Sequence, residues 1–366
     1  WMYFADGKSK YDQLFIDIGQ ATQSIHLLYF IVRKDEVGQR LISLLAQKAA
    51  EGVEVRLVYD SAGCFGTTLK FFDSIIKAGG HVYKFHPPTL RLIGLNYNYR
   101  NHRKIVVIDG RIGYLGGMNV GKEYMSLDPN YSPWRDAHLR LVGDAVWDLQ
   151  HRFFRDYFMV CEDKRDEVHI QSNLDHYFTA SLVTTICPIQ IVSDGPDTPT
   201  DDIKLAFVKM MQTATKSIRI QTPYFIPDQL FLETLKIAAY SGVKVEVMIP
   251  TIADHHYVYR TTTSFIHELL EANIDVYLYK GFLHSKILVI DDEICTVGST
   301  NIDQRSFKIN YEVNAFIYDQ LLTHRVSHQF DKDLENCLLV DESYEKNKSW
   351  VVRLEEKVYR LVSMIL

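Results

Sequence analysis

Two stretches of the chain repeat one pattern of residues whose side chains can do chemistry. The first copy reads His102-Arg103-Lys104, then Asp109, then Gly116-Gly117-Met118-Asn119. The second reads His284-Ser285-Lys286, then Asp291, then Gly298-Ser299-Thr300-Asn301. Both fit H-x-K-x4-D-x6-G-[GS]-x-N without a gap, and so long a pattern rarely recurs in register by chance. Shorter phrases around it also recur, which indicates a duplicated fold unit.

A duplicated set of histidine, lysine and asparagine suits a site that holds a phosphate between two imidazoles. Lysine neutralises phosphodiester charge, and amide hydrogens stabilise the oxygens that gain charge during attack, each such donor contributing about 3 kcal/mol. One histidine can attack phosphorus while the other protonates the leaving alkoxide. The predicted catalytic residues are His102, Lys104, Asn119, His284, Lys286, Ser299 and Asn301.

Two further carboxylates are candidates to orient the imidazoles. Asp136 and Glu312 follow the glycine turns of the first and second motif at similar distances. A histidine nucleophile needs its proton held on the nitrogen away from the reaction, commonly by a carboxylate. We expect Asp136 and Glu312 to do this, whereas Asp109 and Asp291 fall at the turn after each motif and are expected to support the structure.

The motif residues are predicted to lie on strands. Residues 104–108 are rich in β-branched side chains, and the tight-turn pair Asp109-Gly110 follows them. Successive strand residues alternate faces, so His102 and Lys104 should point the same way. The same reasoning applies to the second copy, so that each strand offers an imidazole beside an ammonium group.

Helices and strands alternate around both motifs. The elements predicted in the first half are helices at 11–23 and 37–50 and strands at 24–32 and 53–59. Those predicted in the second half are helices at 204–213 and 229–240 and strands at 217–221 and 243–249. This order predicts an α/β fold of two similar halves, each a mixed, largely parallel sheet covered by helices, with the active site at their interface.

The predicted boundaries follow the repeat. The first half spans 1–186, the second 187–345, and residues 346–366 form a C-terminal amphipathic helix whose apolar stripe could face either the domain or a bilayer. The long segment 85–100 before the first motif is a candidate lid, substrate contact or solvated loop. Tyr224-Phe225-Ile226 is interpreted as core in preference to a lipid contact.

Composition limits the classes of function. Hydrophobic residues make up 47% of the 366 residues, as expected for a chain with a sizeable core, and the net charge of −6 favours no nucleic-acid partner. The five cysteines show no C-x-x-C and are interpreted as free thiols in a reducing compartment. Neither Asp254-His255-His256 nor the pair His324 and His328 is interpreted as a metal site, and no metal or cofactor is predicted.

The paired motifs resemble those of the phospholipase D superfamily, in which each of two halves supplies one H-x-K-x4-D. Residues 96–104, 221–228 and 306–312 are similar to phrases of the bacterial cardiolipin synthases. The resemblance implies that two phosphatidylglycerols yield cardiolipin and glycerol through a phosphohistidine, and it favours His102 as nucleophile. It also implies an anionic membrane surface as partner, on the cytoplasmic side of the cell membrane, with N-terminal membrane helices that this chain lacks.

Two other functions remain open at this point. The same motifs serve phosphodiesterases, either a hydrolytic phospholipase D or a nuclease, and the motif does not encode whether alcohol or water is the acceptor. A non-catalytic lipid-binding module is the third possibility, although a binder has no need of complete His-Lys-Asn sets. The identity of the lipids formed from phosphatidylglycerol would separate the three.

Overall fold

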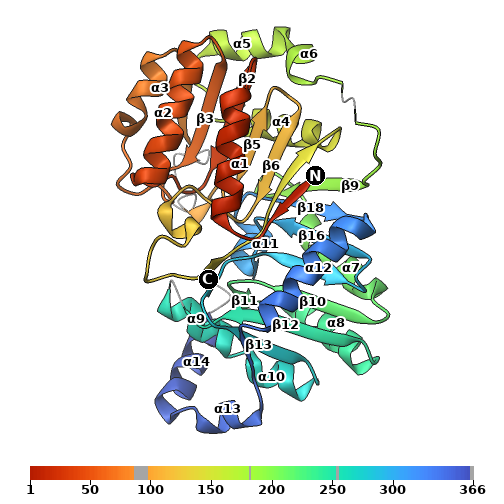
Figure 1. The fold of residues 1–366 in the computed structure, drawn as a ribbon. Coiled ribbons are helices and arrows are strands. Elements are labelled where there is room, and N and C mark those ends of the chain that lie inside the picture. The colour runs from red at the N-terminus through yellow and green to blue at the C-terminus, as the bar shows by residue number, and fades with distance from the viewer. Residues whose placement is uncertain (86–97, 181–182, 253–254, 363–366) are drawn as a thin grey trace.

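The computed structural model describes residues 1–85, 98–180, 183–252 and 255–362, which form two α/β halves stacked one on the other (Figure 1). The strands of the first half are β1 (Met2–Phe4), β2 (Ser24–Tyr29), β3 (Glu54–Asp60), β4 (His81–Phe85), β5 (Ile105–Ile108), β6 (Ile112–Gly116), β7 (Trp134–Arg135) and β8 (His138–Val142). Its helices are α1 (Gly7–Gln20), α2 (Glu36–Ala50), α3 (Asp73–Lys77), α4 (Ala145–Phe158), α5 (Lys164–Ser172) and α6 (Leu174–Tyr177), with 3-10 turns at Leu69–Phe72 and Lys122–Met125.

The second half repeats this plan. Its strands are β9 (Ile189–Asp194), β10 (Ser217–Gln221), β11 (Phe225–Ile226), β12 (Lys244–Pro250), β13 (Asp275–Tyr279), β14 (Phe282–Leu283), β15 (Ile287–Ile290), β16 (Ile294–Gly298), β17 (Ile302–Asp303), β18 (Glu312–Ile317) and β19 (Cys337–Leu339). Its helices are α7 (Asp202–Thr213), α8 (Gln229–Tyr240), α9 (His256–Thr263), α10 (Ile266–Glu271), α11 (Gln304–Lys308) and α12 (Gln320–Leu334), followed by α13 (Glu342–Asn347) and α14 (Trp350–Val362).

The prediction of two similar halves with mixed sheets and helical cover is confirmed. The strand orders are β1-β8-β6-β5-β2-β3-β4 and β19-β13-β12-β10-β15-β16-β18-β9. In the first sheet β1, β6, β2, β3 and β4 run in one direction and β8 and β5 in the other. Within these two sheets the parallel neighbours are β2-β3-β4 and β10-β12-β13, because helices join these strands. The motif strands return through tight turns and pair antiparallel.

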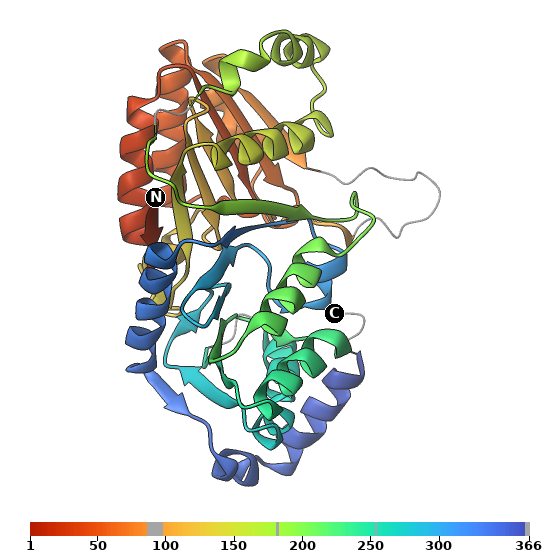
Figure 2. The same cartoon turned by 90° about the vertical axis from the view of Figure 1, so that its right-hand side faces the viewer.

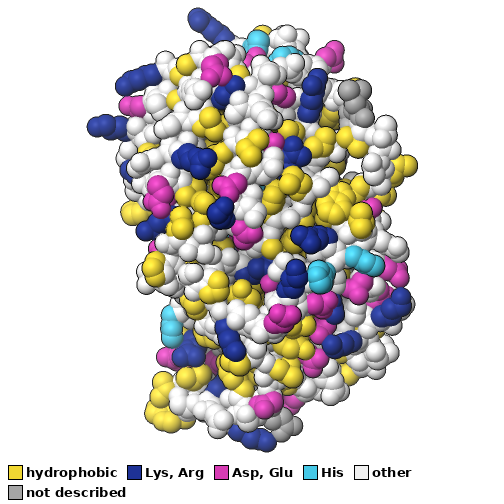
Figure 3. Space-filling model, in the orientation of Figure 1, with side chains coloured by type: hydrophobic (Ala, Val, Ile, Leu, Met, Phe, Trp, Pro, Cys, Tyr) yellow, Lys and Arg dark blue, Asp and Glu magenta, His cyan; other side chains and the backbone are white. Residues whose placement is uncertain are grey.

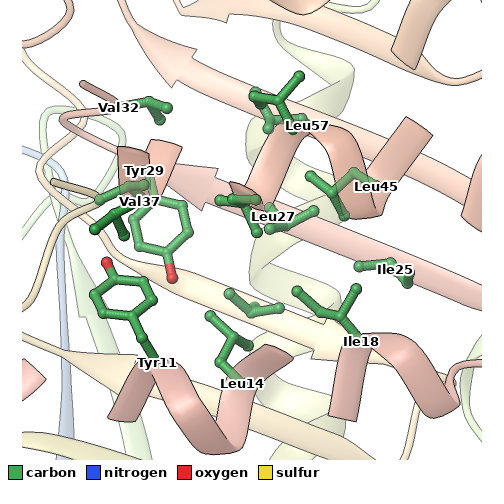
Figure 4. Packing of buried hydrophobic residues seen from close by; sticks show 14 of the residues in the cluster. Tyr11, Leu14, Ile18, Ile25, Leu27, Tyr29, Val32, Val37, Leu45 and Leu57 are labelled. Atoms are coloured by element: carbon green, nitrogen blue, oxygen red, sulfur yellow. The ribbon is translucent and has the colours of Figure 1, made fainter. Parts of the chain in front are cut away.

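The first helix shows why the predicted elements form. The Asp6 carboxylate caps α1 by accepting from the Ser9 amide, and the apolar residues of α1 recur on one face. Figure 4 shows Leu14 and Ile18 of that face directed toward Ile25 and Leu27 of β2. Each such side chain contributes about 1.5–3 kcal/mol when fully buried, which fixes the helix against the sheet.

The duplication extends to backbone conformation. Gly52, after α2, and Gly242, after α8, both have φ of +91°, the left-handed conformation that ends a helix and that glycine adopts without strain. Asp109 and Asp291, at the turns after the two motif strands, also share positive φ, at 52° and 55°. Equivalent positions therefore keep the same turn in both halves.

One of the buried apolar clusters spans both halves. Leu28, Ile105 and Leu115 of the first sheet lie in the same buried cluster as Ile287 and Val313 of the second. Strand β9 runs along the junction and forms the edge of the second sheet, where it pairs with β18, as Figure 2 shows. The face between the sheets is therefore well packed, so it can hold side chains from opposite halves in fixed positions.

Some predicted features fall elsewhere or outside the structure. Residues 86–97, most of the predicted lid or loop, lie outside the described residues, as does Asp254. The predicted boundary after residue 186 lies between α6 and β9, and the proposed C-terminal segment from 346 begins within α13. Among the described residues, no helix is both long and apolar enough to cross a bilayer.

Candidate active site

The first histidine is held by a contact between the halves. Asn101 forms a parallel bridge with Tyr311 of the second half, the His102 amide donates to the Tyr311 carbonyl at 3.0 Å, and the Tyr311 amide donates to the Arg100 carbonyl at 2.8 Å. Strand β5 therefore begins only at Ile105, after the motif histidine and lysine. The bridge places His102 beside Glu312, the residue that follows Tyr311.

The second histidine is held in the same way with the halves exchanged. Strand β14, which precedes His284, pairs in parallel with β7 of the first half. The His284 amide donates to the Arg135 carbonyl at 2.7 Å. This pairing places His284 beside Asp136, the residue that follows Arg135.

Each imidazole is consequently oriented by a carboxylate from the opposite half. His102 Nδ1 lies 2.9 Å from a Glu312 carboxylate oxygen, and His284 Nδ1 lies 2.8 Å from an Asp136 carboxylate oxygen. An ionised carboxylate accepts the Nδ1–H, which leaves Nε2 with its lone pair as the reactive nitrogen. The sequence indicated the two carboxylates, but the exchange between halves follows from the inter-half strand pairing.

Burial keeps both histidines neutral. Desolvation, reinforced by the charges of Lys104 and Lys286, lowers the pKa of each ring from 6.5 to about 4, against the opposing effect of its carboxylate. Burial alone would raise the pKa of Asp136 and of Glu312, but the partner histidine and a nearby lysine outweigh it, and both pKa values fall. The resting site therefore combines ionised carboxylates with neutral imidazoles.

The motif lysines lie behind the histidines. The ammonium groups of Lys104 and Lys286 donate to the backbone carbonyls of His102 and His284, respectively. Both lysines are buried, and burial holds the pKa of Lys104 well below its ordinary value. At these positions the two lysines surround the pair of imidazoles with positive potential, which favours an anionic group between the rings.

The two motif asparagines differ in their surroundings. Both line the cavity described below. Asn119 accepts from the Ile31 amide at 3.1 Å and donates to the Tyr124 hydroxyl at 2.8 Å. The side-chain oxygen of Asn301 is buried without a hydrogen-bond partner, so this amide is less constrained than that of Asn119.

Ser299 acts on a carboxylate and is absent from the described cavity lining. Its hydroxyl donates to the Glu312 carboxylate, and it accepts from the Val313 amide at 3.0 Å. The equivalent residue in the first half is Gly117, where an added Cβ would lie 2.2 Å from an Asp136 carboxylate oxygen. Ser299 therefore positions Glu312, and its contacts give it no direct approach to a substrate.

The motif aspartates anchor the turns. Asp109 accepts from the amides of Thr22, Gln23 and Ser24, and Asp291 accepts from the amides of Thr215, Lys216 and Ser217, at distances from 2.7 to 3.2 Å. Each carboxylate thereby ties the end of a motif strand to the start of the neighbouring strand β2 or β10. Neither belongs to the described lining of the cavity.

Both imidazoles open into one cavity of about 480 Å³ between the halves. Its lining combines both histidines and asparagines with aromatic and basic side chains: Phe30, Ile31, Arg33, Arg100, Glu123, Tyr124, Tyr131, Trp134, Tyr224, Ile226, His255, Tyr257, Val258, Phe282, Asp303, Arg305 and Asn310. Most of these lie outside the repeated motif, so no spacing rule could have identified them. Phe225 and Ile226 are buried in the core and Tyr224 packs against it, while Tyr224 and Ile226 also line the cavity.

The two sides of the cavity have different ring contacts. His284 lies among Trp134, Phe282 and Tyr124, with ring centroids 5.3 to 6.0 Å away. His102 has Phe30 at 5.0 Å. Within the described residues, no group of three or more His, Cys, Asp or Glu side chains is placed to hold a metal ion.

Comparison with known proteins assigns the family. The family model "Cardiolipin synthase, PLD-like domain" matches residues 14–131 and 207–334, a stretch in each half that includes the motif histidine. The chain is 45% identical to the Major cardiolipin synthase ClsA of Bacillus subtilis over 99% of its own length and 74% of that protein. It is 46% identical to a cardiolipin synthase of Staphylococcus aureus over 99% of its own length and 73% of that protein.

Solved structures with the same fold are more distant. A phosphatidylserine synthase of Haemophilus influenzae superposes with a TM-score of 0.77 at 15% identity, over 100% of this chain and 95% of that one. A polyphosphate kinase of Porphyromonas gingivalis gives a TM-score of 0.62 at 14% identity, over 99% of this chain and 52% of that one. With the family match and the curated relatives, this chain belongs to the cardiolipin synthases of the phospholipase D-like family and is a phosphatidyltransferase that makes cardiolipin.

Proposed function

We propose that the chain moves a phosphatidyl group from one phosphatidylglycerol to another through a phosphohistidine. One observation carries the proposal: two neutral imidazoles from opposite halves face one cavity, each with Nδ1 on a buried carboxylate. The arrangement leaves two Nε2 atoms to share the work of nucleophile and proton carrier.

In the first step the Nε2 of one histidine attacks the phosphorus of phosphatidylglycerol. An N–P bond forms, the bond from phosphorus to the glycerol oxygen breaks, and the other imidazole, in its protonated form, gives its Nε2 proton to that oxygen. The pKa of both rings is about 4 in the empty site, and a bound anionic phosphodiester raises it, because a nearby negative charge favours the imidazolium. With substrate bound, the ring that acts as acid therefore takes up from solvent the proton that the leaving group needs, while the attacking ring stays neutral.

In the second step the proton carrier works in reverse. Its neutral Nε2 takes the proton from a glycerol hydroxyl of a second phosphatidylglycerol, whose oxygen attacks the phosphohistidine. The N–P bond breaks and cardiolipin leaves. The buried cations Lys104 and Lys286 and the amides of Asn119 and Asn301 stabilise the charge on phosphorus-bound oxygens in both steps.

The charge of the cavity lining suits anionic headgroups. Its basic residues Arg33, Arg100 and Arg305 outnumber the acidic Glu123 and Asp303, which favours anionic substrates. We propose that the chain works at an anionic membrane surface on the cytoplasmic side of the cell membrane. The five free thiols support a reducing compartment.

The test is incubation with phosphatidylglycerol vesicles, separation of the lipids and quantification of free glycerol. Equal amounts of cardiolipin and glycerol are expected. A sample quenched in denaturant at neutral pH, where the N–P bond of a phosphohistidine survives, should contain enzyme heavier by one phosphatidyl group in denaturing mass spectrometry. Phosphatidic acid as the main product would show that water is the acceptor. Turnover without any adduct in the rapidly quenched enzyme would contradict the phosphohistidine intermediate.

A further inference from the structure

The C-terminal helix α14 docks on the second half through its charged face. Glu356, 7% exposed, accepts from the Thr263 hydroxyl at 2.7 Å and pairs with Lys348 at 2.9 Å. Glu355 pairs with Arg260 of α9 at 3.0 Å. The helix is thus fixed to α9 by ionic and hydrogen-bonded contacts.

The next turn of α14 continues this contact with α10. The Arg360 guanidinium pairs with Glu268 and donates to the Ser264 carbonyl at 3.1 Å. It also lies over the Phe265 ring, 4.2 Å from the centroid. These contacts bury the polar side of an amphipathic helix against the domain.

The apolar side of α14 consequently faces outward. Trp350 is 76% and Leu361 81% exposed, and Val351, Leu354 and Val358 between them are also exposed. Figure 3 shows hydrophobic side chains gathered at the lower left of the molecule, over α14 of Figure 1. A surface helix ordinarily buries its apolar face and exposes its charged face, and a contiguous exposed apolar face marks an interaction site.

A basic groove runs beside this helix. A hollow of about 680 Å³ lies between α10 and the α13–α14 segment. Its lining includes the cations Lys346, Arg353, Lys357 and Arg360, and the acidic side chains Glu271 and Glu356. Cationic side chains therefore border an exposed apolar stripe, the combination that suits an anionic lipid surface.

The same helix α9 connects α14 to the active-site cavity. Tyr257 and Val258 of α9 line that cavity, while Arg260 and Thr263, one turn further along, contact α14. A surface that met α14 would therefore lie close to the cavity wall formed by α9. This position matters because, under the proposed function, both substrates come from a bilayer.

We infer that α14 is an interfacial helix that lays its apolar face on an anionic phospholipid bilayer, with headgroup phosphates received by the neighbouring basic groove. The inference rests on the proposed function only for the lipid nature of the substrate. Trp350 suits the boundary between headgroups and acyl chains, because indole is apolar with one polar edge. The helix holds the catalytic cavity near its substrate without entering the cavity.

The binding test compares two variants on sedimented vesicles of equal parts phosphatidylglycerol and phosphatidylcholine. Leu354→Glu combined with Val358→Glu places charges on the exposed stripe and should lower the partition coefficient at least ~10-fold. The matched control is Ile237→Glu, on the exposed side of α8 at 62% exposure, which should bind like the original chain. Circular dichroism checks that all three are folded.

The groove is tested by charge reversal. Lys357→Glu should weaken binding to the phosphatidylglycerol vesicles and leave binding to pure phosphatidylcholine unchanged, whereas Lys209→Glu, an exposed lysine of α7, should change neither. Equal binding by the stripe variant and the original chain would overturn the inference. So would an oligomer, seen in sedimentation velocity, that the stripe variant dissociates, since a second copy would then cover the face.

A third measurement separates this inference from the proposed function. Dispersed short-chain phosphatidylglycerol, below its critical micelle concentration, needs no membrane docking, so the stripe variant should convert it at the original rate. A protein that bound vesicles through α14 but made no cardiolipin would contradict only the proposed function. A stripe variant that lost activity on the dispersed lipid as severely as on vesicles would contradict the docking role.

Discussion

The two carboxylates that orient the histidines do the same work with different supports. Glu312 is held by the Ser299 hydroxyl, whereas Asp136 is held by the Ala137 amide at 2.7 Å and, more loosely, by the Trp134 indole at 3.3 Å. The shorter aspartate lies against Gly117, in the space where a side chain at that position would be. Ser299 therefore fits the longer Glu312, and Gly117 fits the shorter Asp136. The two halves can differ at these positions as long as each Nδ1 keeps its carboxylate.

The rings themselves also differ. His284 is enclosed by aromatic side chains, while His102 has an aromatic contact on one side and polar residues of the second half nearby. Enclosure by apolar rings excludes water, which matters for a covalent intermediate that water would destroy. The asymmetry indicates that the two histidines are not interchangeable, although their carboxylates and lysines are equivalent.

The largest effect should come from removing either ring. His102→Ala and His284→Ala should each lower kcat by at least ~10³, the scale expected when one member of a catalytic unit is lost. The variant lacking the nucleophile should form no phosphatidyl adduct in denaturing mass spectrometry, while the other should still form it slowly. Near-normal turnover by either variant would contradict a shared site, and equal adduct formation by both would contradict distinct roles.

Replacing either carboxylate by its amide should lower activity less than removing a ring does. Glu312→Gln and Asp136→Asn keep the size of the side chain but lose the charge that holds the Nδ1–H, so kcat should fall ~10–100-fold in each. Because each carboxylate opposes the lowering of its ring's pKa, its loss should lower that pKa further. Steady-state rates and histidine NMR titration measure the two effects. A rise in the pKa of either ring would contradict the assigned pairing.

Exchanging the supports tests whether the pairs are matched. Ser299→Gly removes one hydrogen bond from Glu312 and should lower kcat about 10-fold or less, since one such bond contributes about 0.5–1.5 kcal/mol. Gly117→Ser should do more harm, because the added side chain meets Asp136. Ser285→Gly, beside His284, provides a control at a buried serine whose hydroxyl has no hydrogen-bond partner among the described residues. Equal activity of the two exchange variants would show that the supports are interchangeable.

The smallest expected effect is a selective shift in the pKa of one ring, measured apart from turnover, which the loss of a catalytic lysine also lowers. Burial lowers the pKa of His284 most, and the charge of Lys286 is the next largest cause. For His102 the charge of Lys104 has a larger effect than that of Lys286. Lys286→Met should therefore raise the pKa of His284 more than that of His102, moving its protonation to higher pH. Titration of both rings by NMR measures this, with Lys216→Met, an exposed lysine, as control. A larger shift at His102 would contradict the geometry.

Much of the site could be predicted because its motif occurs in both halves of the sequence. The paired histidines, lysines and asparagines and the carboxylates Asp136 and Glu312 all follow from repeated spacing. Which histidine each carboxylate contacts could not be predicted. Each carboxylate follows the motif of its own half in sequence, yet it contacts the histidine of the other half. Only the bridges of Asn101 with Tyr311 and of β14 with β7 decide which ring it meets.

The fold shows the same limit. Periodicity predicted strand β10 and helix α8 closely, since local sequence patterns determine them. It also predicted an apolar stripe on α14 but could not say which face meets the protein, because that depends on Arg260 and Glu268 in distant elements. The antiparallel return of the first motif strand, by contrast, could be predicted, because the turn pair Asp109-Gly110 is a local signal.

The crossed carboxylates have a consequence for how such a site could be assembled. In a two-fold symmetric pair, a residue i that contacts j on the partner is matched by j contacting i. His102 with Glu312 and His284 with Asp136 obey that reciprocity across the pseudo-symmetry of the chain. Two identical copies of one half, associated about such an axis, would already complete both imidazole–carboxylate pairs. Either half alone would hold a histidine whose Nδ1 has no carboxylate, so the reactive tautomer is a property of the interface.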